Sequence, residues 1–277
     1  MALLLSGCCT GNVAEIPFEY DTKKMPNIAV TFPRQNETDE GTMDFILGLD
    51  TGSEDTLFYN NAAEQLFDSQ EEYVRFCAEA GIDVNNIEDG YFLSFTFPDV
   101  RTDGITFPKL SVLNTPHKNN ALDGVLGYTA FNDYGVMVFD FRKNTLILGR
   151  RKIRRNTVPM KFQKFVITEK PYATVNLISI PVKINGGEKY VLLDTGCSSN
   201  GEPVLLLSDS DDMESATVTI GNNIVYKNVI CRRRADAEFV TLEGRYEVLD
   251  DFIILGNAFF QNHRVQLDFE RMEFAMD

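Results

Sequence analysis

Two short motifs in the chain carry residues that could perform acid–base chemistry. The tripeptide Asp-Thr-Gly occurs at residues 50–52 and again at residues 194–196 of the 277-residue sequence. From average composition, one such tripeptide arises by chance in on the order of one chain in twenty of this size, and two are far rarer. Two carboxylates held about 3 Å apart cannot both ionise easily, so they share a proton. One can then act as a base toward water while the other polarises a carbonyl; the pair titrates as a unit, so sequence does not tell which carries the proton.

The surroundings of the two motifs are repeated as well. An apolar segment leads into each motif, another lies upstream of it, and an apolar run ending in glycine lies downstream. The matching segments are residues 27–32 and 180–184, residues 45–49 and 190–193, and residues 124–127 and 252–256. Phe131 and Phe260 each follow the final glycine by four residues. An internal repeat of this kind fixes the architecture and predicts two related halves.

The pattern between these landmarks favours β structure, because aromatic and β-branched segments recur at short spacing. Each copy contains an expected hairpin, at residues 91–113 in the first and 216–230 in the second, and residues 185–187, Asn-Gly-Gly, are a hairpin turn signal. The extra length of the first copy lies before its hairpin. Residues 61–80 there have the spacing of an amphipathic helix, which Gly81 would end.

An apolar strand that enters Asp-Thr-Gly, followed by an apolar-apolar-Gly segment, resembles the signature of pepsin-like and retropepsin-like aspartic proteases. Two such pairs in one chain resemble the two-lobed arrangement, over roughly residues 25–277. The resemblance implies an all-β fold of two acid-protease-like β-barrel lobes with pseudo-twofold symmetry, with one helical insertion in the first lobe. We expect a targeting or tether segment at residues 1–24, an N-terminal lobe at 25–155 and a C-terminal lobe at 156–277.

By this resemblance, Asp50 and Asp194 form the catalytic dyad. The loop residues expected to support it are Thr51, Gly52, Ser53, Thr195, Gly196 and Cys197. Each glycine lets the backbone turn tightly beside a carboxylate, and in the family each threonine bonds across to the other lobe. Ser53 and Cys197 stand where the family often has a hydroxyl bonded to the carboxylate. A thiol is a weaker donor than a hydroxyl, so Cys197 departs from the family pattern.

The family closes its cleft with a hairpin flap, which the sequence does not clearly contain. Two interpretations stay open. Residues 61–92 could cover the cleft, with Tyr91 in the place of the flap tyrosine, or the insertion could pack outside the lobe.

The resemblance implies an endopeptidase that cleaves a peptide or protein substrate without a cofactor, a metal or a covalent intermediate. One alternative is a non-catalytic lipoprotein binding module that retains the fold. Another is a peptidase that processes its own linker or a single partner. That linker, residues 149–156, gathers five of the chain's 26 basic residues, and we expect it to be a solvated connection between the lobes.

Composition narrows the choice of partners. The formal net charge of −15 argues against a nucleic-acid partner. The five cysteines fit no zinc spacing, and a disulfide between Cys197 and Cys231 stays open. Because both motifs lie in one chain, a monomer can form the complete site.

The N-terminus carries a separate signal. Residues 5–8, Leu-Ser-Gly-Cys, resemble a bacterial lipobox, which would make Cys8 a lipidation site and place the protein in the cell envelope as a membrane-anchored lipoprotein on the periplasmic or outer surface. Only seven residues precede Cys8, and none of them is basic. The alternative is an unprocessed apolar N-terminus. Elsewhere no apolar run reaches the ~18 residues of a membrane helix.

Overall fold

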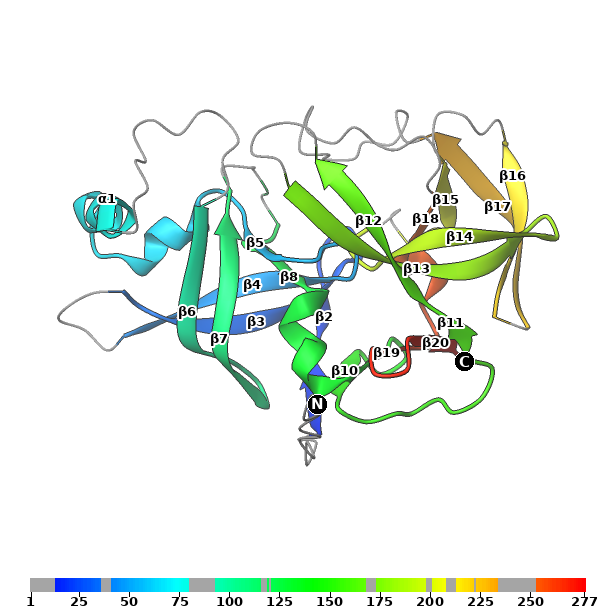
Figure 1. Cartoon of the computed structure of the whole chain (residues 1–277), viewed down its shortest axis with the longest axis horizontal. Coiled ribbons are helices and arrows are strands. Elements are labelled where there is room, and N and C mark those ends of the chain that lie inside the picture. The colour runs from blue at the N-terminus through cyan, green and yellow to red at the C-terminus, as the bar shows by residue number, and fades with distance from the viewer. Residues whose placement is uncertain are drawn as a thin grey trace, which may run out of the picture.

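The computed structural model describes ten stretches of the chain, and it arranges them as two β-rich lobes above a third, shared sheet (Figure 1). The described residues are 13–35, 41–79, 93–115, 119, 121–167, 173–197, 201–207, 213–221, 223–233 and 253–277. Cys8 and Tyr91, which carried the lipidation and flap hypotheses, lie outside them. The all-β fold with two related lobes is confirmed.

The first lobe is a seven-stranded sheet with the strand order β2-β3-β4-β8-β5-β7-β6, in which β3 also pairs with β6. Its strands are β2 (Glu19–Tyr20), β3 (Pro26–Pro33), β4 (Thr42–Asp50), β5 (Thr56–Phe58), β6 (Leu93–Thr102), β7 (Ile105–Asn114) and β8 (Gly124–Gly127). The outer strand β7 alternates between buried and exposed residues, which is the pattern of a strand with one solvated face. The central strand β8 is buried throughout, which explains its apolar sequence.

The second lobe repeats this topology strand for strand. Its order is β12-β13-β14-β18-β15-β17-β16, and β13 also pairs with β16. Its strands are β12 (Lys161–Ile167), β13 (Ala173–Ile184), β14 (Gly187–Asp194), β15 (Val204–Leu207), β16 (Ser215–Ile220), β17 (Ile224–Arg233) and β18 (Ile254–Gly256). The predicted turn between β13 and β14 is confirmed, because Asn185 and Gly186 both adopt the positive φ of a tight hairpin turn.

A six-stranded sheet joins the lobes, with the strand order β1-β10-β9-β19-β20-β11. Its strands are β1 (Ala14–Pro17), β9 (Val136–Asp140), β10 (Thr145–Leu148), β11 (Val158–Pro159), β19 (Arg264–Asp268) and β20 (Glu273–Met276). Its central pair, β9 and β19, comes from corresponding places in the two copies and runs antiparallel. The pseudo-twofold axis therefore passes between these two strands. Residues 13–24, which we expected to precede the fold, instead contribute β1 and β2.

The insertion in the first lobe is shorter and more broken than the sequence predicted. It forms the 3₁₀-helix η1 (Ala62–Leu66) and the α-helix α1 (Gln70–Glu79) instead of one helix over residues 61–80. The aromatic ring of Tyr73 lies against those of Phe67 and Phe95. In Figure 1, α1 lies at the end of the first lobe that is farthest from the second lobe. The described part of the insertion therefore packs outside the lobe and does not cover the interface.

The linker is held to the shared sheet more closely than a solvated connection would be. The Arg151 guanidinium pairs with Asp268 and Glu270. The side chain of Gln266 accepts hydrogen bonds from the backbone N–H groups of Lys152 and Ile153 and donates one to the Ile153 carbonyl. These contacts fix the chain where it passes from one lobe to the other.

Two further expectations can be compared with the structure. Cys197 and Cys231 are free thiols, so the disulfide that the sequence left open does not form. In the part of the chain that the structure describes, no helix is long and apolar enough to cross a membrane.

We predict that Phe32→Ala destabilises the protein by about 3–5 kcal/mol, the usual cost of deleting a buried aromatic ring. Phe32 is fully buried, and its ring lies 5.0 to 5.4 Å from those of Phe45, Phe58 and Phe97. Chemical denaturation measures the change. Val225→Ala is the control, because Val225 is 50% exposed and its truncation should change stability by less than about 0.5 kcal/mol. Equal effects of the two changes would contradict this core assignment.

Candidate active site

Each lobe delivers its aspartate from the end of a central strand. Asp50 ends β4 beside Gly127 of the parallel strand β8, and Asp194 ends β14 beside Gly256 of β18. A Cβ atom at Gly127 would lie only 2.3 Å from the Asp55 carbonyl oxygen, and the one at Gly256 would lie 2.5 Å from that of Cys197. The chain that follows each aspartate therefore passes directly over the glycine. Gly127 and Gly256 thus permit the close approach of the two loops that carry the aspartates.

The two aspartates meet at the lobe interface. Each carboxyl group lies against the motif glycine of the opposite lobe, and the charge of Asp194 raises the pKa of Asp50. A Cβ atom on Gly52 would lie 2.4 Å from Asp194 Cγ, and one on Gly196 would lie 2.6 Å from Asp50 Cγ. Each motif glycine thus leaves room for the carboxyl group of the opposite lobe, a role that goes beyond the tight turn expected from sequence.

Backbone N–H groups also face the carboxyl groups. Gly52 donates to Asp50 Oδ1 at 2.8 Å, and Cys197 donates to Asp194 Oδ1 at 2.7 Å. The Gly196 N–H contributes to both carboxyl groups. Because an N–H donor favours the ionised form, these N–H groups lower the pKa of the carboxyl groups, against the effect of burial.

Burial is the main cause of the shifted pKa of this pair. It raises the pKa of Asp50 well above the usual aspartate value, and the neighbouring charge of Asp194 raises it further. Burial also raises the pKa of Asp194, against the lowering effect of the Cys197 N–H.

Two threonines hold the loops together across the interface. Thr51 Oγ1 donates to the Leu193 carbonyl at 3.0 Å and accepts from the Thr195 N–H at 3.0 Å. Reciprocally, Thr195 Oγ1 donates to the Leu49 carbonyl at 2.7 Å and accepts from the Thr51 N–H at 2.9 Å. Both threonines are fully buried. Buried hydrogen bonds of this kind are costly to break, so the cross-lobe role expected for Thr51 and Thr195 is present.

The residues after the two glycines do not have the expected role. Ser53 Oγ donates to the Asp55 carbonyl at 2.7 Å instead of to Asp50. Burial, and then the nearby charges of Asp194 and Asp50, raise the pKa of the Cys197 thiol well above its usual value. In the described part of the chain, neither side chain donates to a dyad carboxyl group. The hydroxyl position of the family pattern is therefore unused here in both lobes.

Sequence reasoning missed four residues that cross the interface beside the dyad. They are Glu54, Tyr128, Asn176 and Asn257. Tyr128 and Asn257 directly follow Gly127 and Gly256, so superposing the two repeats would have placed them at the same position. Nothing in the sequence pattern marks Glu54 or Asn176, because their partners are far away along the chain.

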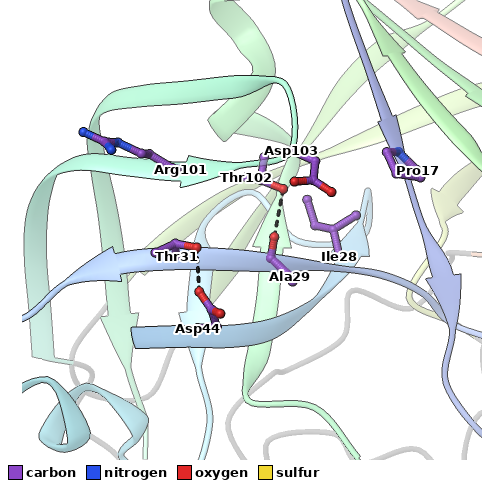
Figure 2. A pocket seen from close by; sticks show the side chains of 8 residues that line it. All are labelled: Pro17, Ile28, Ala29, Thr31, Asp44, Arg101, Thr102 and Asp103. Atoms are coloured by element: carbon purple, nitrogen blue, oxygen red, sulfur yellow. Dashed lines mark hydrogen bonds between the residues drawn. The ribbon is translucent and has the colours of Figure 1, made fainter. Parts of the chain in front are cut away.

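Two pockets lined wholly by described residues lie away from the dyad. Figure 2 shows the smaller one, of about 310 Å³, where Thr31 donates to Asp44 and Thr102 donates to the Ala29 carbonyl. The larger, of about 900 Å³, lies between β7 and the 3₁₀-helix η3 (Tyr128–Tyr134). Among the residues that the structure describes, no group of three His, Cys, Asp or Glu side chains could hold a metal ion.

Comparison with known proteins supports the fold and no more. No protein-family model matches the sequence, and no curated protein is significantly similar to it. Among solved structures, the chain resembles conglutin gamma, a unique basic 7S globulin from lupine seeds, with a TM-score of 0.53 and 10% sequence identity. The match covers 97% of this chain and 95% of that one. The chain thus has a pepsin-like fold along nearly its whole length.

We predict that Thr51→Ala destabilises the protein by about 2 kcal/mol or more, because it leaves the buried Leu193 carbonyl and Thr195 N–H without their partner. The shift of the chemical unfolding midpoint measures this loss. Thr51→Ser is the matched control, since it keeps the hydroxyl and should retain most of the stability. If alanine and serine were equivalent at this position, the cross-lobe bonds would contribute nothing measurable.

A second prediction concerns the pH dependence of stability. Because the folded-state pKa of Asp50 is raised above the unfolded value of about 3.9, protonation of the dyad stabilises the fold fully below that value. This stability is lost as the pH rises through the folded-state pKa. Asp50→Asn removes the titration of Asp50, so the melting temperature of the variant should rise relative to that of the wild type as the pH increases above about 4.

Thermal unfolding at several pH values tests this, with Glu188→Gln on the exposed β13–β14 hairpin as the control. The control should follow the wild type throughout. Parallel curves for the wild type and Asp50→Asn would show that the two carboxyl groups are not coupled to folding.

Proposed function

We propose that the chain is an aspartic endopeptidase. The observation that carries this proposal is the meeting of Asp50 and Asp194 at the interface of two matching lobes, where each carboxyl group lies against the motif glycine of the other lobe. Two carboxyl groups sharing one proton provide a base and an acid at the same place, which hydrolysis of a peptide bond requires.

In the proposed reaction, the ionised member of the pair takes a proton from a water molecule that attacks the peptide carbonyl carbon. The protonated member donates a hydrogen bond to the carbonyl oxygen as negative charge develops there. A proton then passes to the leaving nitrogen and the C–N bond breaks, so that one water is consumed and no bond to the protein forms. The N–H groups of Gly52, Gly196 and Cys197 keep both carboxyl groups oriented throughout.

The substrate would be a peptide or protein segment, and one chain would suffice because it supplies both aspartates. A cofactor has no step to perform in this scheme. Attachment to the cell envelope through Cys8 is a separate proposal that rests on the sequence motif alone.

A second candidate function is a non-catalytic binding module that retains this fold. The structural comparison favours it, since the description of the matched lupine protein as a basic 7S globulin names no enzymatic activity. The absence of a hydroxyl donor to either carboxyl group, among the described residues, also departs from the family pattern. The two intact aspartates that meet at the lobe interface favour the peptidase.

We predict that the purified protein cleaves an unfolded protein substrate at mildly acidic pH and that pepstatin inhibits the cleavage. Asp50→Asn and Asp194→Asn should each reduce the rate by a factor of about a thousand or more, because neither single carboxyl group can act as both acid and base. Mass spectrometry of the products at several pH values measures the rate and also detects cleavage within the chain's own linker.

Ser53→Ala is the control, because its hydroxyl bonds the backbone and not the dyad. It should keep most of the activity. Equal residual cleavage by the wild type and both aspartate variants would remove the peptidase proposal and leave the binding module.

A further inference from the structure

Two of the side chains that cross between the lobes, those of Tyr128 and Asn257, occupy corresponding positions in the two repeats. The hydroxyl of Tyr128, the residue after Gly127, donates to the Asn176 carbonyl at 2.6 Å. The Nδ2 group of Asn257, the residue after Gly256, donates to the Lys24 carbonyl at 2.8 Å.

The two acceptors also correspond. Asn27 pairs with Gly48, two residues before Asp50, and Ser179 pairs with Leu192, two residues before Asp194. Lys24 lies three residues before Asn27, and Asn176 lies three residues before Ser179. The two interlobe contacts, which we call the clasps, are therefore related by the pseudo-twofold axis.

The clasps differ in their donors, a tyrosine hydroxyl in one and an asparagine amide in the other, and the first lobe also adds a carboxylate to one of them. Glu54 accepts a hydrogen bond from the Asn176 backbone N–H at 2.6 Å and another from its Nδ2 group at 2.9 Å. The matching position in the second loop is Ser198, which lies outside the described residues and is not an acidic residue. At the other clasp, the Lys24 N–H donates to the backbone carbonyl oxygen of Asp21, in its own lobe, at 3.0 Å.

Glu54 is fixed to the loop that carries Asp50. Its backbone carbonyl accepts from the Thr129 N–H at 3.3 Å and from Thr129 Oγ1 at 2.5 Å, while the Tyr128 N–H donates to the Ser53 carbonyl at 3.0 Å. The Tyr128 ring stacks on Phe162 of the second lobe, with centroids 5.7 Å apart. Any shift of Asn176 against Glu54 is thus transmitted to the segment that follows Gly52, which itself lies against Asp194.

We propose that Glu54 is a positioning residue that sets the placement of Asp50 against Asp194 by holding Asn176 of the opposite lobe. The proposal rests on the peptidase function proposed above. Hydrogen bonds to a carboxylate are roughly twice as strong as neutral ones, so the clasp that contains Glu54 is the stiffer of the two. Glu54 acts through Asp50 and has no direct part in the chemistry.

The main test is Glu54→Gln, which keeps the size of the side chain but turns an amide toward the Asn176 Nδ2 donor. We expect kcat to fall by a factor on the order of ten to a hundred, with little change in KM, as for a small misplacement of reacting groups. The pH profile of kcat/KM should shift as well, because proton sharing depends on the carboxyl separation. Glu188→Gln makes the same change on an exposed hairpin and should leave both quantities unchanged.

A second substitution that restores activity distinguishes a positioning role of Glu54 from a general loss of structure. Asn176→Asp alone places a second carboxylate beside that of Glu54, and it should lower kcat at least as much as Glu54→Gln does. Combined with Glu54→Gln, it again opposes an amide to a carboxylate, so the double variant should recover part of the rate and of the pH profile. If Glu54→Gln does not fold, Asn176→Ala removes only the Nδ2 bond and keeps the backbone bond, and it should show a smaller shift in the same direction.

A readout without catalysis keeps the two proposals apart. The difference in melting temperature between the wild type and Asp50→Asn, measured as a function of pH, reports the protonation of the dyad. This measurement does not depend on whether the protein cleaves a substrate. If that curve and the pH profile are unchanged by Glu54→Gln, or if the variant only melts lower, the positioning role is overturned. If the wild type has no activity but the curve shifts, the peptidase proposal fails while Glu54 still positions the pair.

Discussion

The carboxyl groups of Asp50 and Asp194 meet where the lobes of this protein join, and each lies against the motif glycine of the opposite lobe. Burial raises the pKa of both groups, and each is close enough for the other to affect it. A hydrogen bond tolerates only a few tenths of an ångström of displacement. The two lobes must therefore be placed against each other with the accuracy of the interior of a single domain.

The duplicated architecture meets this requirement because corresponding segments of the two lobes make the same contacts. The aspartate of each lobe ends a strand that is fixed by a parallel neighbour, and the following loop passes over a glycine of that neighbour. The reciprocal contacts of Thr51 and Thr195 then tie one loop to the other. Below them, β9 and β19 pair across the axis. The same few contacts, made twice, hold both halves of the site.

Departures from this symmetry show where the two lobes have separate roles. The first lobe carries the helical insertion at its outer end and the carboxylate of Glu54 at the interface, whereas the second has a thiol at Cys197. None of these features alters the backbone frame, because each lies in a loop or beyond the strand ends. Glu54 and Cys197 lie in the loops that carry the two aspartates, whereas the insertion lies far from them.

The sequence by itself determined the repeat, and through it the dyad, the lobe topology and the β13–β14 turn. The elements of the repeat are local, since a strand, a turn or a tight loop depends on neighbours in the chain, and their repetition made the pattern visible. The meeting of the two aspartates and the strand order followed from the resemblance of that repeat to a two-lobed fold. The sequence did not determine where Ser53 would direct its hydroxyl, how the insertion at residues 61–80 would break, or that Glu54 would meet Asn176. Those outcomes depend on atoms that come together only after the lobes have packed, 122 residues apart in the case of Glu54 and Asn176, and only the tertiary structure decided them.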